Sequence, residues 1–469
     1  MPTASNTQIV DQIVANARKA QAAFELSATQ ARYDRAALAV GWAIMQPDRN
    51  LEMATLAVDT TGLGNVADKV TKNHRKTLGL LRDIAPVKTC GIISEDAKTG
   101  ITKIARPIGV IGAVVPSTNP IATPANNIIN AVKCGNAIVL SPSPKGIEGC
   151  ARLIGYIHAE FDKIGVDHDL VQMIPAPGTK DKTQRMLEIT DLVVVTGSQN
   201  NVRRAYTSGT PAIGVGAGNV TVIIDETADL AAAAAKIAAS KTFDNATSCS
   251  SENSMIVVDA VYDAFIAELA KVGGATVGSD LEAHVVGHLW QKGHLNKDAI
   301  AQNADVLIDT LDLKGTVPDT TKFLCVETKG IGPDHPLSGE KLSRVAALYR
   351  ASDFKDATRI AATMLNHYGA GHSVGIHTAK TDRAIEMGHI LPTCRVIVNQ
   401  AHCFATGGSF NNGLPFSLSM GCGSWGGNSI DENLHWKHFL NITKVVREIP
   451  VNEPTVNSIF EDYWKVAGQ

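Results

Sequence analysis

The strongest constraint on the fold of this chain is an alternation of short apolar runs with helical segments between residues 109 and 224. Residues 109–115 form a continuous apolar run, as a strand buried on both faces of a parallel sheet does, and further strands are expected at residues 137–140, 171–174, 192–195 and 220–224. Strand–helix alternation with right-handed crossovers predicts a doubly wound α/β sheet. Ligands of such sheets bind beyond the carboxyl ends of the strands, where the loops 142–145 and 197–198 fall.

The rest of the chain divides into a helical start, a second α/β unit and a separate β element. Apolar residues recur at steps of three and four over residues 7–45, which predicts helix, and helices are also expected at 64–83 and 228–242. The composition changes at residues 241–245, and strands are expected near 255–258, 344–349 and 374–377. The pattern of residues 89–106 predicts a β-hairpin, with which a strand at 445–450 could pair.

Composition excludes several classes of protein. The 469 residues are 44% hydrophobic and 19% charged, which argues against a disordered chain and suggests two to four domains. Basic and acidic residues number 43 and 46, so nothing in the charge favours nucleic acid or an anionic membrane as a partner. No apolar run is long enough to span a bilayer, and residues 1–6 do not resemble the start of a signal peptide. A cytoplasmic protein is therefore expected.

One of eight cysteines stands in a setting suited to chemistry. No pair has C-x-x-C spacing, so a cysteine-rich zinc site is disfavoured. Cys249 is flanked by Ser248 and Ser250 rather than by bulky apolar residues, which suits a thiolate that must meet a substrate, although a buried structural cysteine is the alternative. Two histidine pairs, His284/His288 and His435/His438, have helical spacing compatible with a metal, but no third ligand can be assigned, and no metal is expected.

Three other residues are candidates because they follow predicted strands. Asn119 follows the 109–115 strand, where its amide could stabilise an oxyanion, although Asn before Pro is also ordinary turn chemistry. No G-x-G-x-x-G follows that strand. Ser198 begins a predicted helix whose N-terminus could bind a phosphate, and Lys145 could add a charge for a 2′-phosphate.

Three longer motifs, at residues 211–219, 241–252 and 418–429, resemble the aldehyde dehydrogenase superfamily in its CoA-acylating branch. Residues 369–372 and 407–413 resemble those of the stand-alone acylating succinate-semialdehyde and sulfoacetaldehyde dehydrogenases. The resemblance extends over nearly the whole chain.

The resemblance implies a role for individual residues. Cys249 would be the nucleophile, and Asn119, with the Cys249 backbone N–H, would form the oxyanion hole. The residues implied to bind the nicotinamide cofactor, NADP or NAD, are Ser141, Lys145, Gly197, Ser198, Gly216 and Glu340. Hydrolytic members carry a general-base Glu where this chain has Gly214, so a thiol, coenzyme A, is expected to release the acyl group instead of water. Because those members have a Lys where this chain has Ser141, the choice of NAD or NADP stays open, with Lys145 favouring NADP.

The resemblance also implies an architecture. It consists of a Rossmann-type cofactor domain at residues 1–242, interrupted by an oligomerisation hairpin at about 89–106, an α/β catalytic domain at 243–430 and a C-terminal oligomerisation segment at 431–469. In the superfamily the hairpin and the C-terminal strand pair across subunits, so a homodimer or homotetramer is expected.

The aldehyde itself is predicted from polar residues around the nucleophile and from the resemblance. Hydroxyl, amide and imidazole groups suit an aldehyde with an anionic tail better than a plain alkyl one. The candidate substrate-binding residues are Ser248, Ser250, His372, His402 and Ser409, although a packed structural role is the alternative for His372. Sulfoacetaldehyde, giving sulfoacetyl-CoA, is the expected substrate, with succinate semialdehyde and acetaldehyde as alternatives. A hydrolytic dehydrogenase and a catalytically idle scaffold remain the competing functions.

Overall fold

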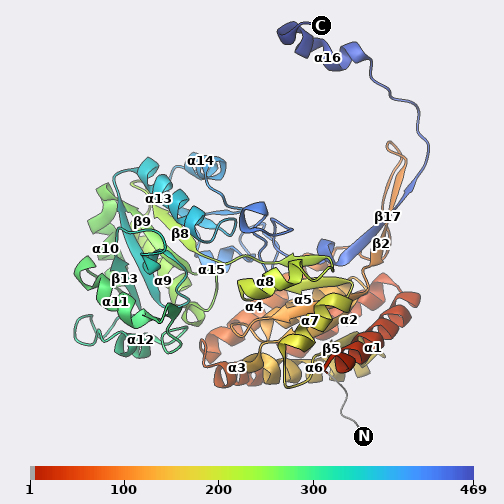
Figure 1. The fold of residues 1–469 in the computed structure, drawn as a ribbon, viewed down its shortest axis with the longest axis horizontal. Helices are drawn as coiled ribbons and strands as arrows, with labels where there is room; N and C mark the ends of the chain where they lie inside the picture. Colours follow the sequence, from red (N-terminus) through yellow and green to blue (C-terminus); the bar gives the residue numbers. More distant parts are fainter. Residues whose placement is uncertain (1–5) are drawn as a thin grey trace.

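The computed structural model describes residues 6–469, which form two α/β lobes and an extended arm (Figure 1). The predicted fold class is confirmed, because each lobe has a parallel sheet with helices packed against it.

The first lobe contains a five-stranded parallel sheet in the order β5-β4-β3-β6-β7. Its strands are β3 (Val110–Val115), β4 (Ala137–Pro142), β5 (Val171–Met173), β6 (Leu192–Val195) and β7 (Ala212–Gly214). Its helices are α1 (Asn6–Leu26), α2 (Gln30–Met45), α3 (Pro47–Thr61), α4 (Val66–Ile84), α5 (Ala122–Lys133), α6 (Ile147–Asp162), α7 (Lys180–Ile189) and α8 (Gln199–Tyr206). Four of the predicted strands are confirmed here.

The predicted continuous helix over residues 7–45 is wrong in one respect, since the chain forms two helices there. Thr29 has extended backbone angles, and its hydroxyl accepts a hydrogen bond from the Arg32 N–H at the start of α2. The apolar spacing continues through this break, so it did not reveal the cap.

The second lobe contains a seven-stranded parallel sheet in the order β10-β13-β14-β9-β8-β15-β16. Its strands are β8 (Val220–Ile224), β9 (Glu252–Val258), β10 (Gly274–Val277), β13 (Phe323–Glu327), β14 (Val345–Ala351), β15 (Val374–His377) and β16 (Val396–Val398), with a small separate pair, β11 (Trp290–Gln291) and β12 (His294–Leu295). Its helices are α9 (Leu230–Thr242), α10 (Tyr262–Lys271), α11 (Glu282–Leu289), α12 (Ala304–Thr310), α13 (Phe354–His367), α14 (Asp382–Ile390) and α15 (His402–Ala405).

The sheet to which β8 belongs differs from the sequence-based expectation. This strand was expected in the first sheet, before a boundary at residue 242, but it lies between β9 and β15 in the second sheet. The chain therefore changes lobe between β7 and β8. The sequence does not show this change, because a buried apolar run does not reveal which sheet will bury it. The chain also returns to the first lobe after β16, where Phe416 and Leu434 pack in its core.

The arm is a three-stranded antiparallel sheet that projects from the first lobe (Figure 1). It contains β1 (Gly91–Asp96), β2 (Ile101–Pro107) and β17 (Leu440–Val446), with β2 in the centre. The predicted hairpin and its pairing with a C-terminal strand are confirmed, although that strand begins at Leu440. After it, α16 (Val456–Ala467) extends away from both lobes and buries none of its residues.

Within residues 6–469, no helix combines the length and the apolar character that crossing a bilayer requires.

Candidate active site

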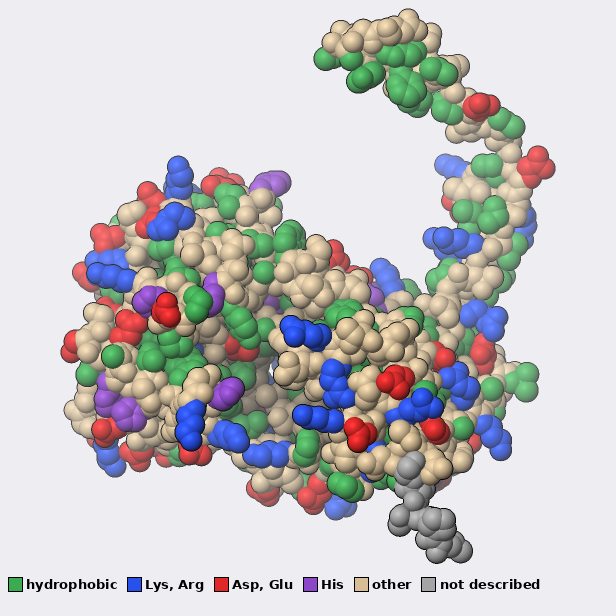
Figure 2. Space-filling view, in the orientation of Figure 1, with side chains coloured by type: hydrophobic (Ala, Val, Ile, Leu, Met, Phe, Trp, Pro, Cys, Tyr) green, Lys and Arg blue, Asp and Glu red, His purple; other side chains and the backbone are tan. Residues whose placement is uncertain are grey.

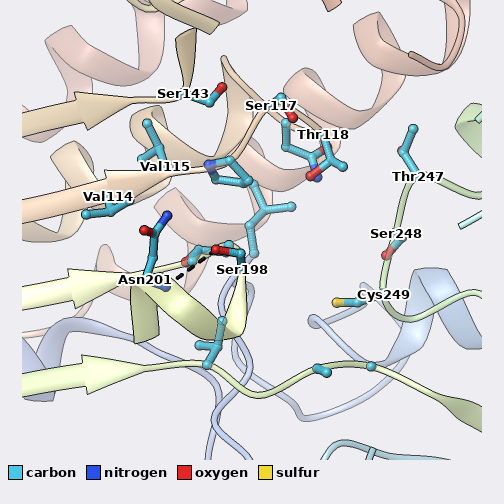
Figure 3. A pocket seen from close by; sticks show the side chains of 18 of the residues that line it. Val114, Val115, Ser117, Thr118, Ser143, Ser198, Asn201, Thr247, Ser248 and Cys249 are labelled. Carbon is cyan, nitrogen blue, oxygen red and sulfur yellow. Dashed lines mark hydrogen bonds between the residues drawn. The ribbon is translucent and has the colours of Figure 1, made fainter. Parts of the chain in front are cut away.

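A cavity of about 620 Å³ lies where the two lobes meet. The carboxyl ends of β3, β4 and β6 form one wall, and the loop before β9 that carries Cys249 forms another (Figure 3). This is the edge of the sheet at which ligands were expected. Nine of the predicted site residues line the cavity: Asn119, Ser141, Gly197, Ser198, Gly216, Ser248, Cys249, Ser250 and Glu340.

Cys249 lies on a tightly turned loop, and its sulfur points into the cavity (Figure 3). The residues Asp244, Asn245 and Ala246 before it have φ angles of 48°, 53° and 59°, which residues with a Cβ rarely adopt. Side-chain contacts hold this turn: the Asp244 carboxylate accepts from Lys72, and the Asn245 amide oxygen accepts from Arg344. Such strain persists only where the surrounding contacts fix it, as they do here.

A histidine contacts the nucleophile sulfur. His372 Nε2 lies 3.3 Å from Cys249 Sγ, and its Nδ1 lies 2.8 Å from the Ser373 hydroxyl. That hydroxyl is also 2.9 Å from His402 Nε2, so both predicted histidines belong to one buried chain of contacts. Burial, and then the Arg395 charge, lower the pKa of His372 to about 3, so its ring is neutral at physiological pH. A neutral Nε2 at this distance can accept a hydrogen bond from the thiol.

Burial, and then the nearby Glu340 carboxyl, raise the pKa of the Cys249 thiol to about 12. The thiol is therefore protonated at physiological pH, and its ionisation requires a proton acceptor. His372 is placed to be that acceptor.

Asn119 is oriented by a lysine that the sequence did not single out. Its side-chain oxygen accepts from Lys72 Nζ at 2.8 Å, which leaves the side-chain N–H groups free to donate to a substrate. The same ammonium donates to the Thr247 hydroxyl at 3.2 Å. Lys72 thus connects the amide that would stabilise an oxyanion with the loop of the nucleophile.

The wall formed by the first lobe offers groups that fit a dinucleotide phosphate. Ser198 caps α8, with its hydroxyl accepting from the Asn201 N–H at 3.4 Å (Figure 3). The N-terminus of α8 faces the cavity through Gly197 and Ser198, and Lys180 and Arg204 also line it. The Ser143 hydroxyl is buried, lines the same wall and has no hydrogen-bond partner among the described residues.

The other predicted site residues lie outside the lining. Lys145 is not among the lining residues, and its ammonium donates to the Thr61 carbonyl oxygen at 3.3 Å. Ser409 lies outside the lining and accepts a 3.1 Å hydrogen bond from Arg75. His372 and His402 are also absent from the lining; His372 contacts the cavity-lining Cys249, and His402 is linked to His372 through the Ser373 hydroxyl.

The cavity has a single carboxyl group among the described residues that line it, that of Glu340. Burial raises the pKa of this group to about 7. Gly214 lies outside the lining, and a Cβ there would face Val202 and Tyr206. No carboxylate therefore stands at the position where hydrolytic relatives are expected to have their general base.

Comparisons with known proteins agree with this geometry. The model of the aldehyde dehydrogenase family matches residues 1–417. The chain belongs to the aldehyde dehydrogenase family. It is 53% identical to an acylating sulfoacetaldehyde dehydrogenase of Cupriavidus necator, over all of this chain and 95% of the relative. It is 34% identical to an acetylating succinate-semialdehyde dehydrogenase of Clostridium kluyveri, over 94% of this chain and 96% of the relative.

Solved structures show the same relationship. An acetylating aldehyde dehydrogenase from Geobacillus thermoglucosidasius superposes with a TM-score of 0.91 at 31% identity, over 96% of this chain and 98% of that one. This member of the aldehyde dehydrogenase family is thus an oxidoreductase with the family's two-lobed architecture.

Sequence reasoning missed two groups of residues in the site of this aldehyde dehydrogenase. The first is the basic set Lys72, Arg75 and Lys76 on α4, which lines the cavity. The spacing of these residues places them on one helix face, but such a face is usually exposed to solvent. The second is Gly218, which lies against the nucleophile and was noted only as part of a motif.

Gly218→Ala is expected to impair catalysis by displacing the nucleophile. A methyl group at this position would lie 2.2 Å from the Cys249 carbonyl oxygen and 2.6 Å from its Cβ, so the loop must move. Displacing a reacting group by about 1 Å costs roughly 10²-fold in rate, and we expect kcat/KM to fall by about that factor. Initial rates of nucleotide reduction test this.

Gly155→Ala is the matched control, because a Cβ there meets nothing within 4 Å and the residue lies inside α6. It should keep normal rates and an equal or higher melting temperature. Normal rates in Gly218→Ala would show that the loop tolerates the displacement and that the contact does not fix the nucleophile.

Each of the two histidine pairs has a carboxylate nearby in the structure, which could be a third metal ligand. His284 and His288 lie near Asp312, and His435 and His438 lie near Glu432. Both clusters are separate from the active-site lining. His284 Nε2 and His288 Nδ1 already contact backbone carbonyl oxygens at 2.9 Å, which is a structural role.

Proposed function

We propose that this protein is a CoA-acylating aldehyde dehydrogenase that oxidises sulfoacetaldehyde to sulfoacetyl-CoA, with NADP⁺ or NAD⁺ as the oxidant. The observation that carries the proposal is the set of groups around Cys249. A thiol and an amide donor line one cavity, a proton acceptor contacts the thiol from outside the lining, and Gly214 provides no carboxylate to activate water. The acylating sulfoacetaldehyde dehydrogenase of Cupriavidus necator, at 53% identity, supports the choice of aldehyde.

The first step in this proposal is attack of the Cys249 sulfur on the aldehyde carbon. His372 Nε2 accepts the thiol proton as the S–C bond forms. The carbonyl oxygen becomes an oxyanion, which accepts hydrogen bonds from the Asn119 amide and from the Cys249 backbone N–H. The result is a thiohemiacetal on Cys249.

The nucleotide would be held by the α8 N-terminus at Gly197 and Ser198 and by the hydroxyl of Ser143, with Glu340 on the ribose next to the nicotinamide. When bound, it supplies the hydride acceptor that converts the thiohemiacetal to a thioester. Lys180 and Arg204, which line the same wall, are better placed than Lys145 to meet an additional 2′-phosphate. On this basis NADP⁺ is the proposed oxidant, with NAD⁺ as the alternative.

Release of the acyl group is proposed to use the thiol of coenzyme A. The CoA sulfur attacks the thioester carbon, the bond to Cys249 breaks, and one proton leaves for solvent over the whole reaction. A thiol needs less activation than water because part of it is ionised near neutral pH. The absence of a base at Gly214 therefore favours a thiol over water.

The deciding experiment follows nucleotide reduction with sulfoacetaldehyde, succinate semialdehyde and acetaldehyde, each with and without CoA. Sustained turnover only with CoA supports an acylating enzyme, and the aldehyde with the highest kcat/KM identifies the substrate. Sustained turnover without CoA would show that water releases the acyl group. No reduction of either nucleotide with any of the three aldehydes would favour an idle scaffold.

A homodimer or homotetramer assembled through the arm is part of the proposal. The outer edge of β17 pairs with no strand among residues 6–469, and α16 exposes apolar side chains. Figure 2 shows hydrophobic residues gathered on this isolated helix. All eight cysteines are free, in keeping with a reducing cytoplasm.

Phe460→Asp with Tyr463→Asp is expected to weaken this assembly, since each places a charge on the apolar face of α16. Light scattering should show a shift toward the 49.6 kDa monomer. Lys465→Asp, on the same helix, is the control and should keep the assembly of the unmodified chain. An unchanged mass in the double variant would exclude α16 from the interface.

A further inference from the structure

We propose that Arg75 and Lys76 on α4 form the binding site for the anionic tail of the aldehyde substrate, a terminal sulfonate or carboxylate. This inference rests on the proposed function, in which an aldehyde reacts at Cys249. It assigns the selectivity for that aldehyde to the side chains of Arg75 and Lys76.

Both side chains line the cavity that contains the nucleophile. Lys76 is buried, and its ammonium donates to the carbonyl oxygens of Gly407 at 2.5 Å and Ser417 at 3.2 Å. An ammonium has three N–H groups, so one remains for a ligand.

The cations on this helix outnumber the carboxylates around them. Lys69 and Lys72 share the single carboxylate of Asp244. Arg75 and Lys76 form no ion pair with any Asp or Glu of residues 6–469. Burial and the Arg75 charge lower the pKa of Lys76 to about 7.

Buried cations without counterions are costly, because burial removes hydration and no opposite charge replaces it. A ligand that brings a negative charge would compensate them. The same cost is uncompensated with a neutral aldehyde, so the charge arrangement selects for an anion.

Arg75 is held in place before any substrate arrives. Its Nη2 donates to the Ser409 hydroxyl at 3.1 Å and to the Phe404 carbonyl oxygen at 3.4 Å. Its guanidinium lies 5.0 Å from the centre of the Phe404 ring. A guanidinium fixed in this way can present its remaining N–H groups to two oxygens of one sulfonate or carboxylate.

The nucleotide phosphates are a different anion with a different set of ligands. The groups proposed for them, Ser198, Lys180 and Arg204, lie on α7 and α8, whereas Arg75 and Lys76 lie on α4. The cavity therefore has two basic walls on separate elements. The α4 wall also contains Lys72, which contacts Asn119 and so adjoins the reacting carbonyl.

The first test compares Arg75→Gln and Lys76→Met with the unmodified enzyme, using sulfoacetaldehyde, succinate semialdehyde and neutral acetaldehyde. We expect the ratio of kcat/KM for either anionic aldehyde to that for acetaldehyde to fall at least 30-fold in each variant. The two anionic aldehydes separate a sulfonate site from a carboxylate site, since the natural tail should suffer the larger loss. Arg82→Gln, an exposed residue of the same helix paired with Asp83, should leave the ratio unchanged. An unchanged ratio in both site variants would overturn the proposal.

The second test needs no turnover, so it separates this inference from the proposed function. Iodoacetamide alkylation of Cys249 is followed by peptide mass spectrometry with and without ethanesulfonate. Ethanesulfonate should slow labelling of the unmodified protein at least 5-fold, and uncharged ethyl methyl sulfone should not.

Loss of that protection in Arg75→Gln, with retention in Lys180→Gln, assigns the anion to the α4 wall. Equal protection in Arg75→Gln and the unmodified protein, or no protection in either, would overturn the inference whatever the enzyme's activity. If the protein is protected as expected but oxidises no aldehyde, the proposed function fails and the anion site stands. Should Lys76→Met fail to fold, Arg75→Gln alone decides the outcome.

Discussion

Cys249→Ala is expected to reduce CoA-dependent aldehyde oxidation by roughly 10⁴-fold or more, because it removes the atom that forms the covalent intermediate. The folded structure should persist, since Cys249 lines a cavity and its sulfur belongs to no disulfide. Steady-state rates with saturating CoA and a thermal melting curve measure the two effects. Loss of activity with an unchanged melting temperature is the expected result.

Cys422→Ala is the matched control, because it removes the sulfur of a different cysteine, which stands between Gly421 and Gly423. It is buried outside the cavity lining, where its side chain packs against Gly216 and Gly426. Its variant should keep most of the activity. Substantial turnover by Cys249→Ala, or a selective loss in Cys422→Ala, would transfer the nucleophile to the other cysteine.

Much of the site could be predicted because it depends on local sequence. Cys249 and Asn119 each stand in a short motif beside a strand, and both line the cavity. Ser198 was expected to begin a helix, and it caps α8. In each case a strand end or helix start near the residue in sequence fixes its position.

What could not be predicted depends on contacts between distant segments. The approach of His372 to Cys249 joins positions 123 residues apart, and no local pattern encodes it. The sheet that receives β8 is decided by β9 and β15, not by the strand itself. Lys145 follows the correct strand, but its side chain turns to the Thr61 carbonyl oxygen.

The basic face of α4 is the clearest case of this limit. Charged residues at helical spacing usually face water, so Lys72 and Lys76 resemble an ordinary solvated face in the sequence. The structure turns this face inward, against Asp244 and the carbonyl groups of residues 407 and 417. Buried polar groups need hydrogen-bond partners. The polar face of α4 lines the cavity, where a ligand can provide such partners.

Asn119→Ala is the second variant for which we expect a large effect, a fall in kcat of about 10²–10³-fold, the usual consequence of removing one oxyanion donor. The amide acts on charge that develops only as the Cys249 sulfur attacks, so KM should change much less than kcat. Stability should change little, because Lys72 keeps Asp244 and Thr247 as partners when it loses the Asn119 oxygen. Initial rates over a range of aldehyde concentrations separate kcat from KM.

Two further measurements distinguish an oxyanion role from general damage to the loop. Ser117→Ala changes a neighbouring cavity-lining residue of the same loop and should retain normal kcat. The rate at which iodoacetamide alkylates Cys249 should be the same with and without Asn119, because alkylation develops no negative charge on a carbonyl oxygen. If Asn119→Ala slows alkylation as much as it slows turnover, then Asn119 acts by positioning the thiol and not by stabilising the oxyanion.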